Sequence, residues 1–296
     1  MAEHEQWDIV SSVGLTALGV AVARALETRD DNGLIQDPYA ERLSRAAQPQ
    51  GQLTGVLDAE PEDEAARELW TAMAAHLGVR SRFFDEYFRK SAEGGVRQAV
   101  ILASGLDARP WRLEWPDDFR LFEIDQPQVI DFKDRVLAED GAEARCKRFA
   151  VRADLREDWQ SELLSAGFDP ELPTAWLAEG LLPYLPPEAE QELLNSITRL
   201  SAPGSRVALE HAATANFTEA LDDPFFQQVS ERWGVDMQQL IHMDERTPAI
   251  SRLQEQGWQV DWDENGSTTA AEYGREVTGN GAKFLDSVHY AAAHRG

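Results

Sequence analysis

Cysteine is almost absent from this sequence, with Cys146 as the single residue of its type among 296. One cysteine cannot form an intrachain disulfide, so nothing in the chain indicates an oxidising compartment. Positive charge is also scarce, because 28 Lys and Arg residues stand against 53 Asp and Glu residues, a net charge of −25. Such a chain repels a phosphate backbone, and we therefore expect no nucleic-acid partner.

Long hydrophobic runs are missing as well. The longest apolar stretch, residues 13–26, contains Arg24 and is shorter than the roughly 20 residues that a membrane-spanning helix needs. Residues 1–8 are acidic, and no apolar segment with a small-residue cleavage site follows them, as it would in a signal peptide. We expect a cytoplasmic protein with no membrane partner.

The apolar pattern divides the chain into two regions. In residues 1–94 apolar side chains recur at helical spacing, as at Leu15, Leu18 and Val22, which predicts an N-terminal helical cover. Residues 48–61 are expected to form an exposed loop in this region. Residues 95–296 alternate short β-rich runs with amphipathic helices, which is typical of a parallel sheet with crossover helices.

We predict an α/β fold with a Rossmann-like core of about seven mostly parallel strands. The strands are expected near residues 98–103, 120–124, 148–153, 175–179, 206–211, 259–263 and 284–291. Helices are expected at 127–139, 188–200 and 247–256. The pair Asn280-Gly281 favours a tight turn before a final antiparallel strand.

Ligands of such sheets bind beyond the carboxyl ends of the strands, so residues just after each strand are candidates for the site. Gly105 lies in the turn after the first strand and Asp125 ends the second, a separation of 125 − 105 = 20 residues. At that separation, dinucleotide-binding folds place the carboxylate that accepts hydrogen bonds from ribose hydroxyls. A cofactor that contains ribose is therefore predicted.

The turn itself favours S-adenosyl-L-methionine over a nicotinamide cofactor. A dinucleotide fingerprint needs three glycines around the pyrophosphate, and only Gly105 is present here. S-adenosyl-L-methionine carries adenosine without phosphate, so it fits a turn that lacks the phosphate-binding glycines. The nicotinamide cofactor remains the alternative at this stage.

Two further acids follow strand ends. Asp154-Leu155 after the third strand suits an adenine, because a carboxylate accepts the amino group while a backbone N–H donates to a ring nitrogen. Glu179 follows the fourth strand. The alternatives are that Asp154 caps the next helix and that Glu179 is a solvated loop acid. Three acids after three consecutive strands favour a binding site.

Several motifs occur in one order along the chain. They are Asp37-Pro-Tyr-Ala40, Arg80-Ser-Arg-Phe-Phe-Asp85, Leu102-Ala-Ser-Gly-Leu-Asp-Ala-Arg-Pro-Trp-Arg-Leu113, Phe122-Glu-Ile-Asp-Gln-Pro127 with Lys133, Ala153-Asp-Leu-Arg156 and Ala178-Glu-Gly-Leu-Leu-Pro-Tyr-Leu185. With them, roughly residues 16–210 resemble the leucine carboxyl methyltransferase-like family, and most closely its bacterial branch of S-adenosyl-L-methionine-dependent methyltransferases.

The resemblance implies a class I methyltransferase core with an N-terminal helical cover and S-adenosyl-L-methionine as cofactor. The residues that it assigns to the cofactor are Arg80 for the methionine carboxylate, Gly105 for the methionine part, Asp125 for the ribose, and Asp154 with Leu155 for the adenine. Gln126, next to Asp125, and Glu179, after the fourth strand, complete the predicted cofactor-binding set. Arg82 is the alternative to Arg80. The family usually has glycine where this chain has Ala103, whose methyl group could crowd the cofactor or shift the turn.

Methyl transfer from a sulfonium needs positioning and desolvation rather than a metal. The six histidines form no pair with ligand spacing, so no metal site is expected. His211 at the end of the fifth strand is either a general base or a residue that lines the pocket or caps the strand, and we favour the second. No catalytic residue is assigned.

Residues 212–246 interrupt the alternation of strands and helices and include the aromatic residues Phe217, Phe225, Phe226 and Trp233. We interpret them as an insertion that covers the substrate, with ordinary packing of inserted helices as the alternative. The expected reaction is O-methylation, at a carboxylate or hydroxyl, of a small-molecule acceptor. Two alternatives stay open, namely carboxyl methylation of a protein C-terminus and a catalytically silent S-adenosyl-L-methionine-binding protein.

Overall fold

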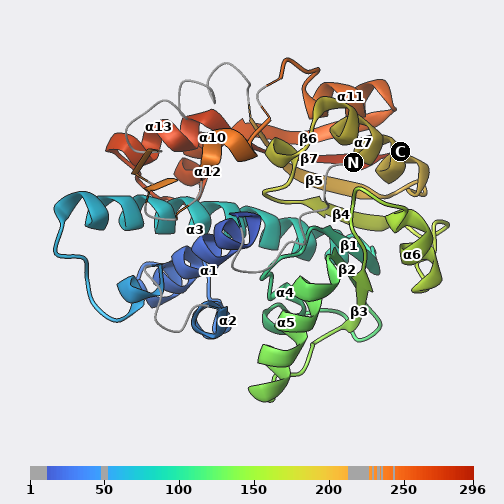
Figure 1. Cartoon of the computed structure of the whole chain (residues 1–296). Coiled ribbons are helices and arrows are strands. Elements are labelled where there is room, and N and C mark those ends of the chain that lie inside the picture. The colour runs from blue at the N-terminus through green and yellow to red at the C-terminus, as the bar shows by residue number, and fades with distance from the viewer. Residues whose placement is uncertain are drawn as a thin grey trace, which may run out of the picture.

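The fold is described by a computed structural model that covers residues 12–47, 53–212, 227–228, 230–231, 234, 236–242 and 244–296 (Figure 1). Most of the expected substrate-covering insertion, including its four aromatic residues, lies outside the described residues. No helix in the described ranges is long and apolar enough to cross a membrane.

Seven strands in the described part of the chain form one sheet. They are β1 (Gln98–Leu102), β2 (Arg120–Asp125), β3 (Lys147–Arg152), β4 (Thr174–Ala178), β5 (Arg206–Ala212), β6 (Trp258–Asn265) and β7 (Val288–Arg295). Their order is β3-β2-β1-β4-β5-β7-β6, with β1 to β5 paired in parallel and β7 antiparallel to both of its neighbours. The predicted Rossmann-like class I core is confirmed.

Helices cover both faces of this sheet. They are α1 (Ser12–Arg29), α2 (Ala40–Ala47), α3 (Glu64–Glu93), α4 (Arg109–Arg112), α5 (Pro127–Glu139), α6 (Trp159–Ser165), α7 (Pro187–Arg199), α10 (Met237–Leu240), α11 (Ala249–Glu255), α12 (Gly266–Glu272) and α13 (Gly279–Ser287), with the 3-10 helices η1 (Thr54–Leu57) and η2 (Leu182–Tyr184). The helices predicted at 127–139, 188–200 and 247–256 correspond to α5, α7 and α11.

The central strand β1 is buried on both faces, which explains its continuous apolar sequence. Ala99 and Ile101 pack in the hydrophobic cluster that includes α1 and α3, whereas Val100 and Leu102 pack in the cluster that includes α6, α7 and α11. Successive side chains of a strand point to opposite faces, so β1 contributes to both halves of the core.

The long helix α3 joins the N-terminal helices to the sheet. Its N-cap is Asp63, whose side chain accepts a hydrogen bond from the N–H of Ala65 at 3.3 Å. The helix runs beside α1 and contacts β4, β5 and β7, as well as α12 and α13 from the C-terminal end of the chain (Figure 1). The N-terminal helices therefore form part of one layer of the fold.

Two predictions about the chain were wrong. Residues 284–287 are helical rather than extended, because the segment from Gly279 forms α13, whose Leu285 is buried in the cluster with α3, and β7 begins only at Val288. Tertiary packing thus overrides the turn expected at Asn280-Gly281. The loop expected to be exposed also departs from the prediction in its described part, where Leu53 and Leu57 are buried.

The turn after β1 carries backbone strain at Ala103. Its φ angle is +49°, and no other non-glycine residue in the described part of the chain has a positive φ. This left-handed region costs an alanine about 1 kcal/mol or more relative to its preferred conformations, whereas glycine adopts it freely. The strain lies at the position where the family resemblance expects a glycine.

We expect Ala103→Gly to raise the free energy of unfolding by up to about 1 kcal/mol, because it relieves this strain. The measurement is urea unfolding followed by circular dichroism. The control is Ala99→Gly in the same segment, where φ is not positive, and it should destabilise the protein by at least about 0.5 kcal/mol. Equal destabilisation by both changes would contradict the strain at Ala103.

Candidate functional site

A cavity of about 620 Å³ opens at the carboxyl ends of the parallel strands. It lies beside β1 and β4, where the strand order reverses, which is the usual ligand position in open α/β sheets. The seven residues that the sequence assigns to the cofactor all line it: Arg80, Gly105, Asp125, Gln126, Asp154, Leu155 and Glu179. The fold therefore brings the whole predicted set together.

Asp125 is joined directly to the turn after β1. Its Oδ2 accepts a hydrogen bond from the N–H of Gly105 at 2.6 Å, and its Oδ1 accepts one from the N–H of Gln126 at 2.7 Å. Burial raises the pKa of this carboxyl, and the two N–H groups oppose that rise. Gly105 and Asp125, which are 20 residues apart in the sequence, are thus in direct contact. Each carboxylate oxygen of Asp125 keeps a further lone pair that can accept from a ligand hydroxyl.

The buried side chain of Lys133 contacts the same turn through Ser104. Its Nζ lies 2.7 Å from Glu123 Oε1 and donates to Ser104 Oγ at 3.2 Å, with both ionic side chains fully buried. Glu123 also pairs with Arg148. Lys133, which the sequence showed only as part of a motif, positions the turn rather than contacting a ligand.

Asp154 and Gln126 lie next to each other in the cavity wall. Gln126 Nε2 donates to Asp154 Oδ2 at 3.4 Å, and Arg156 pairs with the same carboxylate across a tight turn. The alternative that Asp154 caps the next helix is wrong, because α6 begins at Trp159 and its N-cap is Asp158. The side chain of Asp154 therefore belongs to the cavity rather than to a helix start.

Glu179 is a buried, doubly paired acid at the middle of the cavity. Its Oε1 lies 2.7 Å from Arg80 Nε and its Oε2 lies 2.7 Å from Arg109 Nη1. Burial acts to raise its pKa, but the two guanidinium groups outweigh burial and hold the pKa well below its usual range. The alternative of a solvated loop acid is wrong.

Arg80 lies between two acids, because its Nη1 is also 3.1 Å from Glu210 Oε2. Burial raises the pKa of Glu210, and Arg80 counteracts that rise. Arg82, the alternative to Arg80, is half-exposed, pairs with Glu86 and does not line the cavity. Arg24 does line it, a position that sequence reasoning left out.

The structure also assembles a group of side chains that the sequence did not reveal. His211 Nε2 lies 2.8 Å from Asp263 Oδ1, and His289 Nδ1 lies 3.3 Å from the same oxygen. The three residues come from β5, β6 and β7, and His211 lines the cavity. Their spacing along the chain carries no signal, because His211 and His289 meet only through the antiparallel register of β5 and β7.

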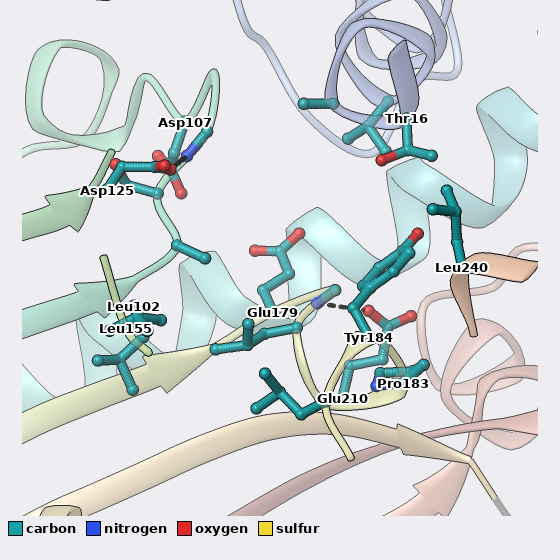
Figure 2. A pocket seen from close by; sticks show the side chains of 18 of the residues that line it. Thr16, Leu102, Asp107, Asp125, Leu155, Glu179, Pro183, Tyr184, Glu210 and Leu240 are labelled. Carbon is teal, nitrogen blue, oxygen red and sulfur yellow. Dashed lines mark hydrogen bonds between the residues drawn. The ribbon is translucent and has the colours of Figure 1, made fainter. Parts of the chain in front are cut away.

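The cavity has two chemically different halves. Figure 2 shows Asp125 and Leu155 on one side, Tyr184 and Leu240 on the other, and Glu179 between them. The half with Leu240 also contains Pro183, Thr16 and Glu210, and the cavity wall further includes the apolar residues Leu77, Leu185, Ile241, Phe284 and Val288. One half thus offers carboxylates at strand ends, and the other combines apolar with polar side chains.

The family model and the relatives that match this chain all describe methyltransferases. The model of the leucine carboxyl methyltransferase family matches residues 17–198. A protein of Saccharopolyspora erythraea is 53% identical over 91% of each chain, and one of Mycobacteroides abscessus is 45% identical over 93% of this chain and 89% of its own. Both bear the name "Putative S-adenosyl-L-methionine-dependent methyltransferase".

The fold has a counterpart among solved structures. A DUF574 family protein from Streptomyces avermitilis aligns with a TM-score of 0.57 at 14% identity, covering 94% of this chain and 97% of its own. This likeness concerns the fold alone. The family match over residues 17–198 and the relatives at 45% and 53% identity show that the chain belongs to the leucine carboxyl methyltransferase family and is an S-adenosyl-L-methionine-dependent methyltransferase.

Proposed function

We propose that this enzyme methylates a hydroxyl oxygen of a small, largely apolar molecule. The observation that carries the proposal is that the cavity extends from a half with strand-end acids to a half whose wall joins apolar side chains such as Leu240 to polar ones such as Tyr184. The cofactor would occupy the first half and the acceptor the second. A cavity of about 620 Å³ is in the range of small-molecule sites.

The residues present suit S-adenosyl-L-methionine. Asp125 would accept hydrogen bonds from the ribose, and Asp154 with Leu155 would bind the adenine. Arg80 faces Glu179 and Glu210 with Nε and Nη1, so its Nη2 remains to donate to the methionine carboxylate. The adjacent acids suit the methionine ammonium group. The cofactor supplies an activated methyl group, and the protein's part is to position the acceptor oxygen and exclude water.

The charges of the cavity favour a hydroxyl over a carboxylate as acceptor. Arg24 and Arg80 line the cavity, where Arg24 is paired with the buried Asp37 at 3.1 Å and Arg80 would be engaged by the methionine carboxylate of the cofactor. Glu210, in the half with Leu240, would repel a carboxylate acceptor. This argues against methylation of a protein C-terminus, whose carboxylate would need a cationic partner.

Ala103 does not argue for a silent protein. The turn keeps its left-handed conformation in spite of the methyl group, and the N–H of Gly105 still reaches Asp125. The alanine therefore strains the backbone of the turn, and the hydrogen bond between Gly105 and Asp125 is still formed.

S-adenosyl-L-methionine and S-adenosylhomocysteine should raise the melting temperature, because a ligand that binds only the folded state stabilises it by mass action. At 100 times the dissociation constant the gain is about 2.7 kcal/mol. Differential scanning fluorimetry measures it, with NAD as the control ligand. A shift with NAD and none with the two adenosyl compounds would contradict the assignment.

Asp125→Asn should weaken S-adenosylhomocysteine by about 10- to 150-fold, because an NH₂ group replaces one carboxylate oxygen and the ribose loses one hydrogen bond to a charged group, worth roughly 1.5–3 kcal/mol. Asparagine is preferred to alanine because it keeps one acceptor for the N–H groups of Gly105 and Gln126. Titration calorimetry gives the affinity, and Asp118→Asn on the exposed surface is the matched control. Binding within about threefold of the parent would refute the ribose role.

Arg80→Lys should weaken S-adenosylhomocysteine by about 10-fold and 5′-methylthioadenosine by less than about twofold, since only the former has the carboxylate that the planar guanidinium engages. The comparison of two ligands on one variant separates binding from any change in folding. Arg82→Lys is the control and should alter neither affinity. Equal losses for both ligands would remove Arg80 from the methionine end of the site.

A further inference from the structure

The cluster of His211, Asp263 and His289 lies beside the cavity and reaches it through His211. His211 and His289 are cross-strand partners on β5 and β7, and Asp263 lies on β6 opposite Ala291, two residues from His289. Because side chains alternate between faces, this register places all three on the same face of the sheet. His211 is the member that lines the cavity.

The hydrogen bonds of the cluster define how the imidazole of His211 is held. Asp263 Oδ1 lies 2.8 Å from His211 Nε2, so this nitrogen donates to the carboxylate when the ring is neutral. The ring's other nitrogen, Nδ1, is then the one that carries a lone pair. A carboxylate that fixes the tautomer of a histidine is the arrangement by which imidazoles are prepared to accept protons.

The carboxylate is suited to that task. Partial burial acts to raise the pKa of Asp263, but its hydrogen bonds with His211 and His289 outweigh burial and hold the pKa well below its usual range. Asp263 is therefore ionised at neutral pH and stabilises a positive charge on the ring next to it. Within the described ranges, the titratable groups that interact with His211 are Asp263, His289 and, at the adjacent position of β5, Glu210.

We propose that His211 is the general base of the reaction and that Asp263 is its positioning residue. The inference rests on the proposed function, since it requires a hydroxyl acceptor. As the acceptor oxygen bonds to the transferred methyl carbon, His211 takes the hydroxyl proton on Nδ1. The bond from that carbon to sulfur breaks, and sulfur keeps the electron pair. The products are a methyl ether, a neutral thioether and an imidazolium paired with Asp263.

The same three side chains could instead hold a divalent cation, because their ligand atoms lie within 4.8 Å of one another. The hydrogen-bond geometry favours the base, since one oxygen of Asp263 already serves both imidazoles at 2.8 and 3.3 Å. A chelator and added Zn²⁺ distinguish a bound cation from the base.

The test uses 1-naphthol and 1-naphthoic acid, which present a hydroxyl and a carboxylate on the same apolar body, with radiolabelled S-adenosyl-L-methionine. His211→Gln should lower transfer to 1-naphthol by about 100-fold at pH 7. The deficit should shrink to within about threefold near pH 10, where a phenol ionises without a base. Asp263→Asn should lower transfer by about 10-fold and recover in the same way.

The chain offers a matched control in Asp261, which makes the same kind of hydrogen bond with His294 at 2.8 Å between β6 and β7 and does not line the cavity. Asp261→Asn should leave transfer unchanged. Nitrogen-15 spectra of the histidine rings supply a second measurement. His211 should be protonated at Nε2 in the parent and should lose this preference in Asp263→Asn.

An unchanged rate in His211→Gln, or a deficit that does not depend on pH, would overturn the proposal. An Nδ1-protonated His211 in the parent would overturn it too, as would activity that a chelator abolishes and Zn²⁺ restores. Transfer to 1-naphthoic acid alone would also overturn it while leaving the methyltransferase intact. Transfer to neither compound would count against the acceptor class of the proposed function, and the tautomer of His211 would still decide whether the dyad exists.

Discussion

The three buried ion pairs of Arg109 hold the site together. Its guanidinium contacts Asp85 of α3, Asp107 in the turn after β1 and Glu179 after β4, so one side chain ties the N-terminal helices to two strand ends. Arg109 is only 2% exposed. Removal of such a partner leaves uncompensated charges in a medium that solvates them poorly, and this costs far more than a surface ion pair contributes. The cavity walls therefore keep their positions as a unit.

The pairs extend beyond Arg109 into a continuous buried network. Asp85 also binds Arg112, which approaches Asp37 of the N-terminal region, and Glu179 leads through Arg80 to Glu210. Four guanidinium groups, those of Arg24, Arg80, Arg109 and Arg112, face five carboxylates, those of Asp37, Asp85, Asp107, Glu179 and Glu210. The excess of one carboxylate suits a cofactor with a positive sulfonium. The electrostatic attraction between the carboxylates and the cofactor weakens once methyl transfer has made the sulfur neutral. The same excess of acid disfavours a carboxylate as acceptor.

What the sequence could predict follows from which contacts are local. Parallel strands end at one edge, so Asp125, Asp154 and Glu179 could be placed in one site from strand positions alone. Two of the three partners of Arg109 could not be found, since Asp85 is 24 residues away on a different helix and Glu179 is 70 residues away. The helix at 279–287 was missed because its stability comes from packing, against a local Asn-Gly signal for a turn.

The family match ends before several residues of the cavity wall and before the whole histidine cluster. Its range, residues 17–198, contains the turn at Gly105, the three strand-end acids and every member of the Arg109 network except Glu210. Leu240, Ile241, Phe284 and Val288 of the cavity wall and the histidine cluster on β5, β6 and β7 lie outside that range, whereas Leu77, Pro183 and Leu185 of the wall lie inside it. Under the proposed function, relatives can share the cofactor and the buried network while residues after 198 contribute to the choice of acceptor. Among these residues, His211 and its register with His289 offer the group that would act on the acceptor oxygen.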